Sequence, residues 1–198
     1  MKYDNPPFIY LKNPDYENFS GRSNKSSAKG FNNDNWNEVR FDIDKSVNPD
    51  IEGTLLDMSQ VETGSIDAVY SCHNIEHVYP HEVPIVLKEF LRVLNDDGFV
   101  VILCPDLIST CKAVVQDRLY DSLYESQAGP IAPIDILYGL RGDLQKGNHY
   151  MAHKCGFTYS ILLNFFISVG FKKWIGGTRP KHYELCHIAC KSEKKMKS

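Results

Sequence analysis

Residues 66–104, IDAVYSCHNIEHVYPHEVPIVLKEFLRVLNDDGFVVILC, carry the pattern that decides the fold. IDAVYS, at the start, is a short apolar run of the kind found in strands buried on both faces, and FVVILC, at the end, is a second one. Between them, Pro84 opens a helical pattern and Gly98 supplies a C-terminal stop. The apolar residues of that pattern recur at helical spacing: Leu87, Phe90, Leu91 and Leu94. A strand, a helix and a strand joined by short connections predict a right-handed crossover in a parallel sheet, and hence an α/β fold.

The flanking sequence extends this sheet on both sides. PPFIYL and VRFDID are predicted strands that precede it, and YSILLNFFISVG predicts a helix that ends at Gly170. FKKWIGG and YELCHIAC predict a final antiparallel strand pair. We therefore expect a doubly wound, mostly parallel Rossmann-like sheet with an antiparallel final strand pair, arranged as a three-layer sandwich.

Length and composition are those of one globular domain spanning residues 1–198. The chain has 198 residues, of which 42% are hydrophobic, and a net charge of -3, which gives no general attraction to nucleic acid or to anionic membranes. No run approaches the roughly 20 apolar residues of a membrane span. Six scattered cysteines without a C-x-x-C pair, and no signal-like start, favour reduced thiols in a cytoplasmic protein.

Three segments depart from the strand and helix pattern. Residues 12–37 are rich in Asn, Ser, Gly and Lys and nearly lack aliphatic side chains, which predicts a mobile loop. Residues 119–157 are long, rich in Gly and Pro and studded with aromatic residues, which is typical of a functional insertion, here on the substrate side. Residues 191–198 are basic and predict a frayed tail.

HNIEHVYPH, residues 73–81, is the stretch with the most chemistry. Its first residues satisfy H-x-x-E-H, a zinc-peptidase pattern that needs both histidines and the glutamate on one continuous helix. Pro80 breaks any such helix and removes His81 from its face, and no helical pattern downstream supplies a third glutamate ligand. We therefore predict no metal site.

Two compatible interpretations of this stretch remain. Glu76 and His77 could hydrogen-bond to nearby backbone and stabilise the turn. Ser71, His73 and Asn74 could line a crevice at the carboxyl end of the preceding strand, where open α/β sheets bind ligands.

Three segments then point to a family: FDIDKSVNPDIEGTLLDMS, GSIDAVYSCHNIEHV and LKEFLRVLNDDGFVVILCPDL. In this order and spacing, over residues 38–107, the chain resembles the class I S-adenosylmethionine-dependent methyltransferases, in particular the methyltransferase type 11 group. The resemblance implies a Rossmann-like fold, S-adenosylmethionine as the cofactor and a small-molecule or saccharide acceptor.

The resemblance also implies which residues bind the cofactor. Asp42 takes the place of the acid that holds the ribose, since a carboxylate can accept hydrogen bonds from both sugar hydroxyls. Thr54 stands where the family's adenine loop usually opens with an acid, so the amide of Leu55 is expected to make the adenine contact. The full predicted cofactor set is Asp42, Ile43, Asp44, Thr54, Leu55, Asp57, Ser71, Cys72, His73 and His77.

A base is useful only where the acceptor must lose a proton, and histidine suits that role at neutral pH. The candidates are His73, His149 and His153. Asp106, at the end of a strand, Tyr138 and His153 are the predicted substrate-binding residues. Each has a structural alternative: Asp106 could cap the helix that begins at Leu107.

The family's glycine-rich turn after the first strand is missing. PPFIYL is followed by KNPDYENF, with no glycine before Gly21. Pro14 removes an amide and side chains occupy the space where the cofactor's methionine part would lie. The alternative to an active enzyme is therefore a methyltransferase-like binding or scaffold domain without activity.

Overall fold

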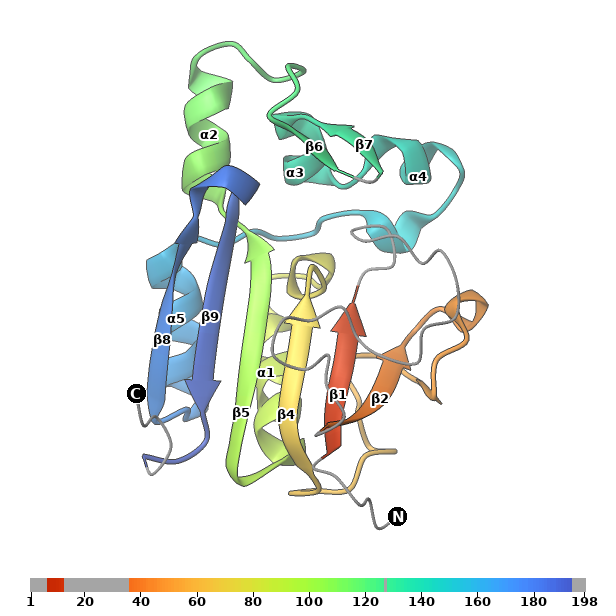
Figure 1. Ribbon diagram of the computed structural model, residues 1–198, viewed down its shortest axis with the longest axis vertical. Coiled ribbons are helices and arrows are strands. Elements are labelled where there is room, and N and C mark those ends of the chain that lie inside the picture. Colours follow the sequence, from red (N-terminus) through yellow and green to blue (C-terminus); the bar gives the residue numbers. More distant parts are fainter. Residues whose placement is uncertain (1–6, 13–35, 127, 194–198) are drawn as a thin grey trace.

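A seven-stranded mixed sheet forms the centre of the molecule, in the order β3-β2-β1-β4-β5-β9-β8 (Figure 1). The computed structural model describes residues 7–12, 36–126 and 128–193. Strands β1 to β5 pair in parallel, whereas β9 is antiparallel to both β5 and β8. The strands are β1 (Pro7–Lys12), β2 (Asn37–Asp42), β3 (Ile51–Glu52), β4 (Ile66–Cys72), β5 (Leu94–Pro105), β8 (Lys173–Arg179) and β9 (Glu184–Cys190). The predicted parallel α/β sheet with an antiparallel final pair is confirmed.

Helices α1 and α5 lie side by side on one face of the sheet (Figure 1). The helices are α1 (Val83–Val93), α2 (Leu107–Val115), α3 (Pro133–Tyr138), α4 (Arg141–Gln145) and α5 (Tyr159–Val169). Short 3-10 turns are η2 (Lys45–Val47), η3 (Ile75–His77), η4 (His149–Met151) and η5 (Pro180–His182). In the described part of the chain no helix packs on the opposite face of the sheet. The described residues therefore do not include the predicted third layer.

The main core lies between this helical layer and the sheet. Leu87 and Phe90 of α1 and Phe166 of α5 are fully buried there, because the helical spacing of apolar residues places them on one face. Each such side chain contributes about 1.5–3 kcal/mol through the apolar surface it removes from water. This core fixes the strands whose carboxyl ends carry the polar residues discussed below.

Helix α1 ends earlier than the sequence predicts. It stops at Val93, and Leu94 already begins β5, so Gly98 lies inside the strand rather than ending the helix. Asn95 competes with the helix, since its side-chain oxygen accepts the amide of Asp97 at 3.0 Å. Gly98 serves close packing instead: a Cβ atom there would lie 3.0 Å from the carbonyl oxygen of Asn95.

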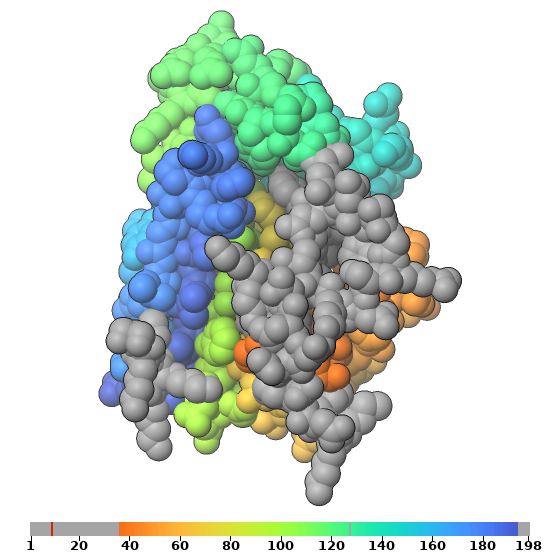
Figure 2. Space-filling view, viewed as in Figure 1, coloured from red at the N-terminus to blue at the C-terminus, as the bar shows by residue number. Residues whose placement is uncertain are grey.

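Residues 119–157, which we call the capping segment, fold over the carboxyl ends of the strands. They contain a small two-stranded sheet, β6 (Tyr124–Ser126) with β7 (Gly129–Ile131), followed by α3, α4 and η4. In the space-filling view the green and turquoise residues that follow β5 form a continuous cap above the sheet (Figure 2). The predicted mobile loop over 12–37 lies almost wholly outside the described residues, as does most of the predicted tail over 191–198.

None of the described helices combines the length and the apolar character that crossing a bilayer requires.

Candidate functional site

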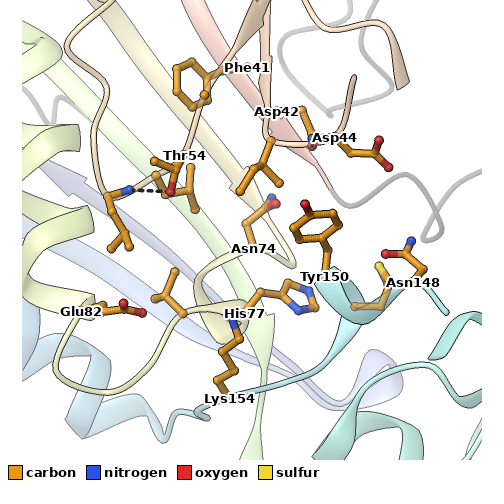
Figure 3. A pocket seen from close by; sticks show the side chains of 16 residues that line it. Phe41, Asp42, Asp44, Thr54, Asn74, His77, Glu82, Asn148, Tyr150 and Lys154 are labelled. Atoms are coloured by element: carbon orange, nitrogen blue, oxygen red, sulfur yellow. Dashed lines mark hydrogen bonds between the residues drawn. The ribbon is translucent and has the colours of Figure 1, made fainter. Parts of the chain in front are cut away.

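A pocket of about 250 Å³ opens at the carboxyl ends of the parallel strands. The strand ends and the turn after β3 form one side, and η3 and residues 148–154 form the other (Figure 3). The lining residues are Phe41, Asp42, Ile43, Asp44, Gly53, Thr54, Leu55, Leu56, Asn74, His77, Val78, Glu82, Asn148, Tyr150, Met151 and Lys154. This edge of a parallel sheet is where open α/β folds bind ligands.

Asp42, the last residue of β2, is held rigidly at the edge of the pocket. Its Oδ1 accepts the amide of Asp44 at 2.8 Å, and its carbonyl accepts the amide of Gly53 at 2.9 Å. Burial raises the pKa of the half-buried Asp42 carboxyl, against the lowering effect of the Asp44 amide. A carboxylate has several further lone-pair positions with which it can accept hydrogen bonds from a ligand.

The turn after β3 presents backbone and a hydroxyl to the pocket. Thr54 Oγ1 accepts the amide of Leu56 at 3.3 Å, as drawn in Figure 3. Asp57 closes this turn, donating its amide to the Thr54 carbonyl at 3.0 Å, but its side chain is exposed and does not line the pocket. Hydrogen bonds from Ser59 lower the pKa of Asp57. Of the predicted adenine loop, Thr54 and Leu55 therefore face the pocket and Asp57 does not.

His73 is buried between two carboxylates. Its Nδ1 lies 3.2 Å from Glu76 Oε1 and its Nε2 lies 3.2 Å from Glu184 Oε2, while Arg179 contacts the other oxygen of Glu184 at 2.6 Å. Burial lowers the pKa of His73, but the two carboxylates outweigh it and raise the pKa to about 9. A ring that is already protonated at neutral pH cannot accept a proton, and His73 does not line the pocket. These observations speak against His73 as the base.

The turn η3 is joined to residues 152–155 of the capping segment. The carbonyl of Glu76 accepts the amides of Lys154 at 2.8 Å and Cys155 at 3.2 Å. His77 Nδ1 lies 3.1 Å from the carbonyl of Ala152. The ring of His77 meets that of His153 edge to face, with centroids 4.9 Å apart. The Glu76 and His77 backbone and side chains thus stabilise the turn, as one interpretation of the sequence expected.

Glu76 is fully buried, with one oxygen satisfied and one not. Oε1 contacts His73, whereas Oε2 has no hydrogen-bond partner among the described residues. Burial raises the pKa of Glu76, but His73 outweighs it and lowers the pKa to about 2. Burial lowers the pKa of His153, whose Nδ1 lies 2.7 Å from the carbonyl of Ile136. One potential ligand atom of each of Glu76, His77 and His153 lies within 4.8 Å of the others.

Several predicted site residues do not line the pocket. Asp106 is buried and caps α2, accepting the amides of Ile108 at 3.1 Å and Ser109 at 3.3 Å. Ser71 is fully buried within β4. The others outside the lining are Cys72 and His153, which are half-buried, and Tyr138 and His149, which are exposed.

Glu82, which precedes α1, was not predicted from the sequence, and neither was the wall that residues 119–157 supply: Asn148, Tyr150, Met151 and Lys154. In NHYMAHK, residues 148–154, only the two histidines were predicted as site residues. The residues beside them, Asn148 and Tyr150 among them, are the ones that line the pocket. A polar and aromatic run in a long loop was the available signal.

Comparison with known families gives one match, a methyltransferase domain over residues 26–102. No curated protein sequence matches the chain.

Solved structures of methyltransferases share the fold. The citrinin polyketide synthase CMeT domain superposes with a TM-score of 0.57 at 14% identity, covering 96% of this chain and 47% of its own length. A methyltransferase dependent on S-adenosylmethionine from Archaeoglobus fulgidus gives a TM-score of 0.53 at 10% identity, covering 94% of this chain and 86% of that one. The 1,6-didemethyltoxoflavin N1-methyltransferase of Burkholderia thailandensis, solved with 1,6-didemethyltoxoflavin and S-adenosylhomocysteine, gives 0.50 at 12%, covering 93% and 71%.

This chain spans only about half the length of several of the structures it matches. At these identities the likeness establishes the fold. The sheet order and the structural neighbours agree that the chain has the fold of the class I S-adenosylmethionine-dependent methyltransferases, and residues 26–102 match the model of a methyltransferase domain.

Proposed function

We propose that this protein transfers a methyl group from S-adenosylmethionine to a small-molecule or saccharide acceptor. The observation that carries the proposal is the pocket at the strand ends, where Asp42 and the turn carrying Thr54 face His77 and Tyr150 across one cavity. Its volume of about 250 Å³ lies just below the range of about 300–1,000 Å³ that is typical of ligand pockets. A space of that size suits the nucleoside part of the cofactor.

On the strand side, we assign the adenosyl part of the cofactor to Asp42, Thr54 and Leu55. Asp42 would accept hydrogen bonds from the ribose hydroxyls, because an ionised carboxylate offers only acceptors and two hydroxyls offer two donors. Phe41 and Leu56 supply apolar surface in the same lining, which suits the faces of an adenine ring.

On the capping side, we assign the acceptor to the groups contributed by residues 148–154. Asn148, Tyr150 and Lys154 carry amide, hydroxyl and ammonium groups, and the latter two are exposed at the mouth of the pocket. Such a set can hydrogen-bond to an acceptor rich in hydroxyls, which is the basis for a saccharide or small polar molecule.

Methyl transfer asks mainly for alignment. The sulfonium methyl is already electrophilic, so the enzyme must hold the acceptor atom in line with the carbon–sulfur bond and exclude water. When bound, S-adenosylmethionine would supply the methyl group to the acceptor oxygen and leave as S-adenosylhomocysteine, with the bonding pair of the carbon–sulfur bond kept on sulfur and the acceptor proton lost to solvent. The rigid strand ends and the capping segment supply the two halves of this alignment.

Calorimetric titration with S-adenosylmethionine and S-adenosylhomocysteine tests the proposal. We expect micromolar binding, weakened at least tenfold in Asp42→Ala because a carboxylate hydrogen-bonded to two hydroxyls is worth about 1.5–3 kcal/mol. Asp97→Ala, which alters an exposed carboxylate in the first part of β5 that does not line the pocket, serves as the matched control and should bind like the wild type.

Absence of binding at millimolar ligand would favour the alternative, a methyltransferase-like scaffold domain. The sequence feature behind that alternative is the glycine-free stretch that begins at Lys12, the last residue of β1, and continues with Asn13 and Pro14.

A further inference from the structure

Glu76, His77 and His153 form a cluster in which potential ligand atoms of the three side chains lie close together. Glu76 is fully buried, and its Oε2 has no partner among the residues that the structure describes. A buried carboxylate oxygen without a partner destabilises the fold, and a cation or a hydrogen-bond donor beside it removes that penalty, so such an oxygen indicates a ligand.

The two histidines are oriented by backbone carbonyls. A carbonyl oxygen can only accept, so Nδ1 of His77 donates to Ala152 at 3.1 Å and Nδ1 of His153 donates to Ile136 at 2.7 Å. In a neutral imidazole with its proton on Nδ1, the Nε2 atom carries the lone pair. Carbonyl contacts of this kind fix the tautomer and ring orientation of histidines that bind metals.

Two imidazoles and one carboxylate at this spacing make a three-ligand site. One ring nitrogen of each histidine and one carboxylate oxygen of Glu76 lie within 4.8 Å of one another. Ligands about 2.0–2.2 Å from one tetrahedral ion lie about 3.4 Å apart, so small side-chain rotations would bring the three atoms together. We propose that Glu76, His77 and His153 bind a divalent transition-metal ion.

The donor set selects the kind of ion. Imidazole nitrogen suits Zn²⁺ and its neighbours among the transition metals, whereas Mg²⁺ and Ca²⁺ prefer oxygen ligands throughout. Three protein ligands leave an open coordination position, which is typical of catalytic rather than structural zinc sites.

This proposal revises the prediction of no metal made from the sequence. That prediction required a third ligand from a downstream glutamate on a helix, and the 3-10 turn is indeed short, ending at His77 before Pro80 is reached. The third ligand comes instead from His153, 76 positions after His77 in the chain, which only the return of the capping segment across the strand ends brings near.

The open position borders the pocket, because His77 belongs both to the cluster and to the pocket lining. We assign it to an oxygen of the acceptor, a hydroxyl whose deprotonated form the ion would favour. This last assignment rests on the proposed function, whereas binding of the metal itself does not.

Calorimetric titration of the chelator-treated full chain with Zn²⁺ alone tests the site. We expect one ion per chain at micromolar affinity or better, weakened at least tenfold in both His77→Asn and His153→Asn. Asparagine places an N–H donor near the position of Nδ1, so the carbonyl contacts of Ala152 and Ile136 can persist while the Nε2 ligand is lost. His182→Asn, a change of the same kind at an exposed histidine in η5, should bind Zn²⁺ like the wild type.

Visible absorption of Co²⁺ bound to the protein gives a second readout. We expect the spectrum of a low-coordinate cobalt site in the wild type and its loss in Glu76→Gln, whose far-ultraviolet circular dichroism should match the wild type as a check of folding. Equal Zn²⁺ affinity in the wild type and both histidine variants, or no binding at millimolar Zn²⁺, would overturn the site.

Titration with S-adenosylmethionine separates this inference from the proposed function. Zn²⁺ binding without cofactor binding would support the metal site and overturn the proposed methyltransferase function. Cofactor binding without Zn²⁺ binding would support the proposed function and overturn the metal site.

Discussion

At the scale of single residues, His73 combines an unusual backbone conformation with buried ionic contacts on both sides of its ring. Its backbone has φ = 54°, in the left-handed region that few non-glycine residues adopt. Its ring contacts Glu76 on one side and Glu184 on the other, and Arg179 continues the network to the surface. The protein therefore holds a strained residue in place with buried ionic contacts, and removal of one partner leaves buried charge uncompensated.

Glu184→Gln is expected to lower the free energy of unfolding by about 3 kcal/mol, because it leaves the protonated His73 with a single carboxylate partner and Arg179 without its own. Chemical denaturation of the two proteins measures this difference. Glu193→Gln, at an exposed carboxylate, should change the free energy by less than about 0.5 kcal/mol. A loss at Glu184 as small as that at Glu193 would show that the network contributes little.

At the scale of elements, the end of α3 sets where the capping segment turns back to the pocket. Gly139 has φ = 102°, and a Cβ atom there would lie 2.1 Å from the carbonyl oxygen of Met151. Tyr138 just before it accepts the amide of His153 at 3.2 Å. The backbone of α3 and the backbone of η4 thus pack in direct contact, which only glycine permits at this position.

Gly139→Ala is expected to destabilise the protein by at least about 2 kcal/mol, since the new methyl group both clashes with Met151 and requires a strained φ. Because Met151 and Tyr150 line the pocket, binding of S-adenosylhomocysteine should weaken as well. Thermal unfolding and calorimetric titration report the two effects.

Gly142→Ala is the matched control. It lies in α4 with no atom within 4 Å of the added Cβ, so alanine should leave binding unchanged and stabilise the helix by up to about 1 kcal/mol. Equal behaviour of the two variants would contradict the packing described for Gly139.

At the scale of the whole molecule, the capping segment is tied together by one buried acid. Asp135 in α3 is 3% exposed and accepts the amide of Ala132 at 3.0 Å and the guanidinium of Arg141 at 2.6 and 2.9 Å. Burial raises the pKa of Asp135, but the hydrogen bonds from Arg141 and Ala132 outweigh it and leave the pKa below its usual range. The folded state therefore binds this proton less readily than the unfolded chain does.

It follows that Asp135 stabilises the fold above its unfolded pKa of about 3.9 and loses that contribution as the pH falls through its lower folded value. Asp135→Asn should cost about 2 kcal/mol between pH 5 and 7, and the difference from the wild type should shrink below about pH 4. Melting temperatures across this range measure it. Asp121→Asn, at the exposed pair with Arg118, should show a smaller effect at every pH.

The sheet could be predicted from the sequence because its signals are local. The apolar runs of β4 and β5, and the helical spacing of Leu87 and Phe90, each need only their own neighbours to be recognised. The end of α1 was predicted too late, at Gly98. The side chain of Asn95 accepts the amide of Asp97, and this local hydrogen bond competes with the helix before Gly98 is reached.

The site could be predicted only in the half that follows the strands directly. Asp42, Thr54 and His77 lie within a few residues of a strand end, so their place at the pocket follows from strand order. Tyr150 and Lys154 reach the pocket after the chain has passed through β6, β7, α3 and α4, and no local pattern fixes such a path.

The contacts between η3 and residues 152–155 carry a consequence for biosynthesis. His77 meets the carbonyl of Ala152 across 75 positions of the chain, and the amides of Lys154 and Cys155 close on Glu76 over a similar span. During synthesis, the strand ends and the turn after β3, which form one wall of the cavity, therefore leave the ribosome long before residues 148–154, which contribute to the opposite wall. Until residues 148–154 have folded, the carboxylate of Glu76 is exposed to water. A ribosome-bound fragment that ends before residue 152 has no complete cavity, so a small-molecule ligand cannot stabilise its fold by binding there.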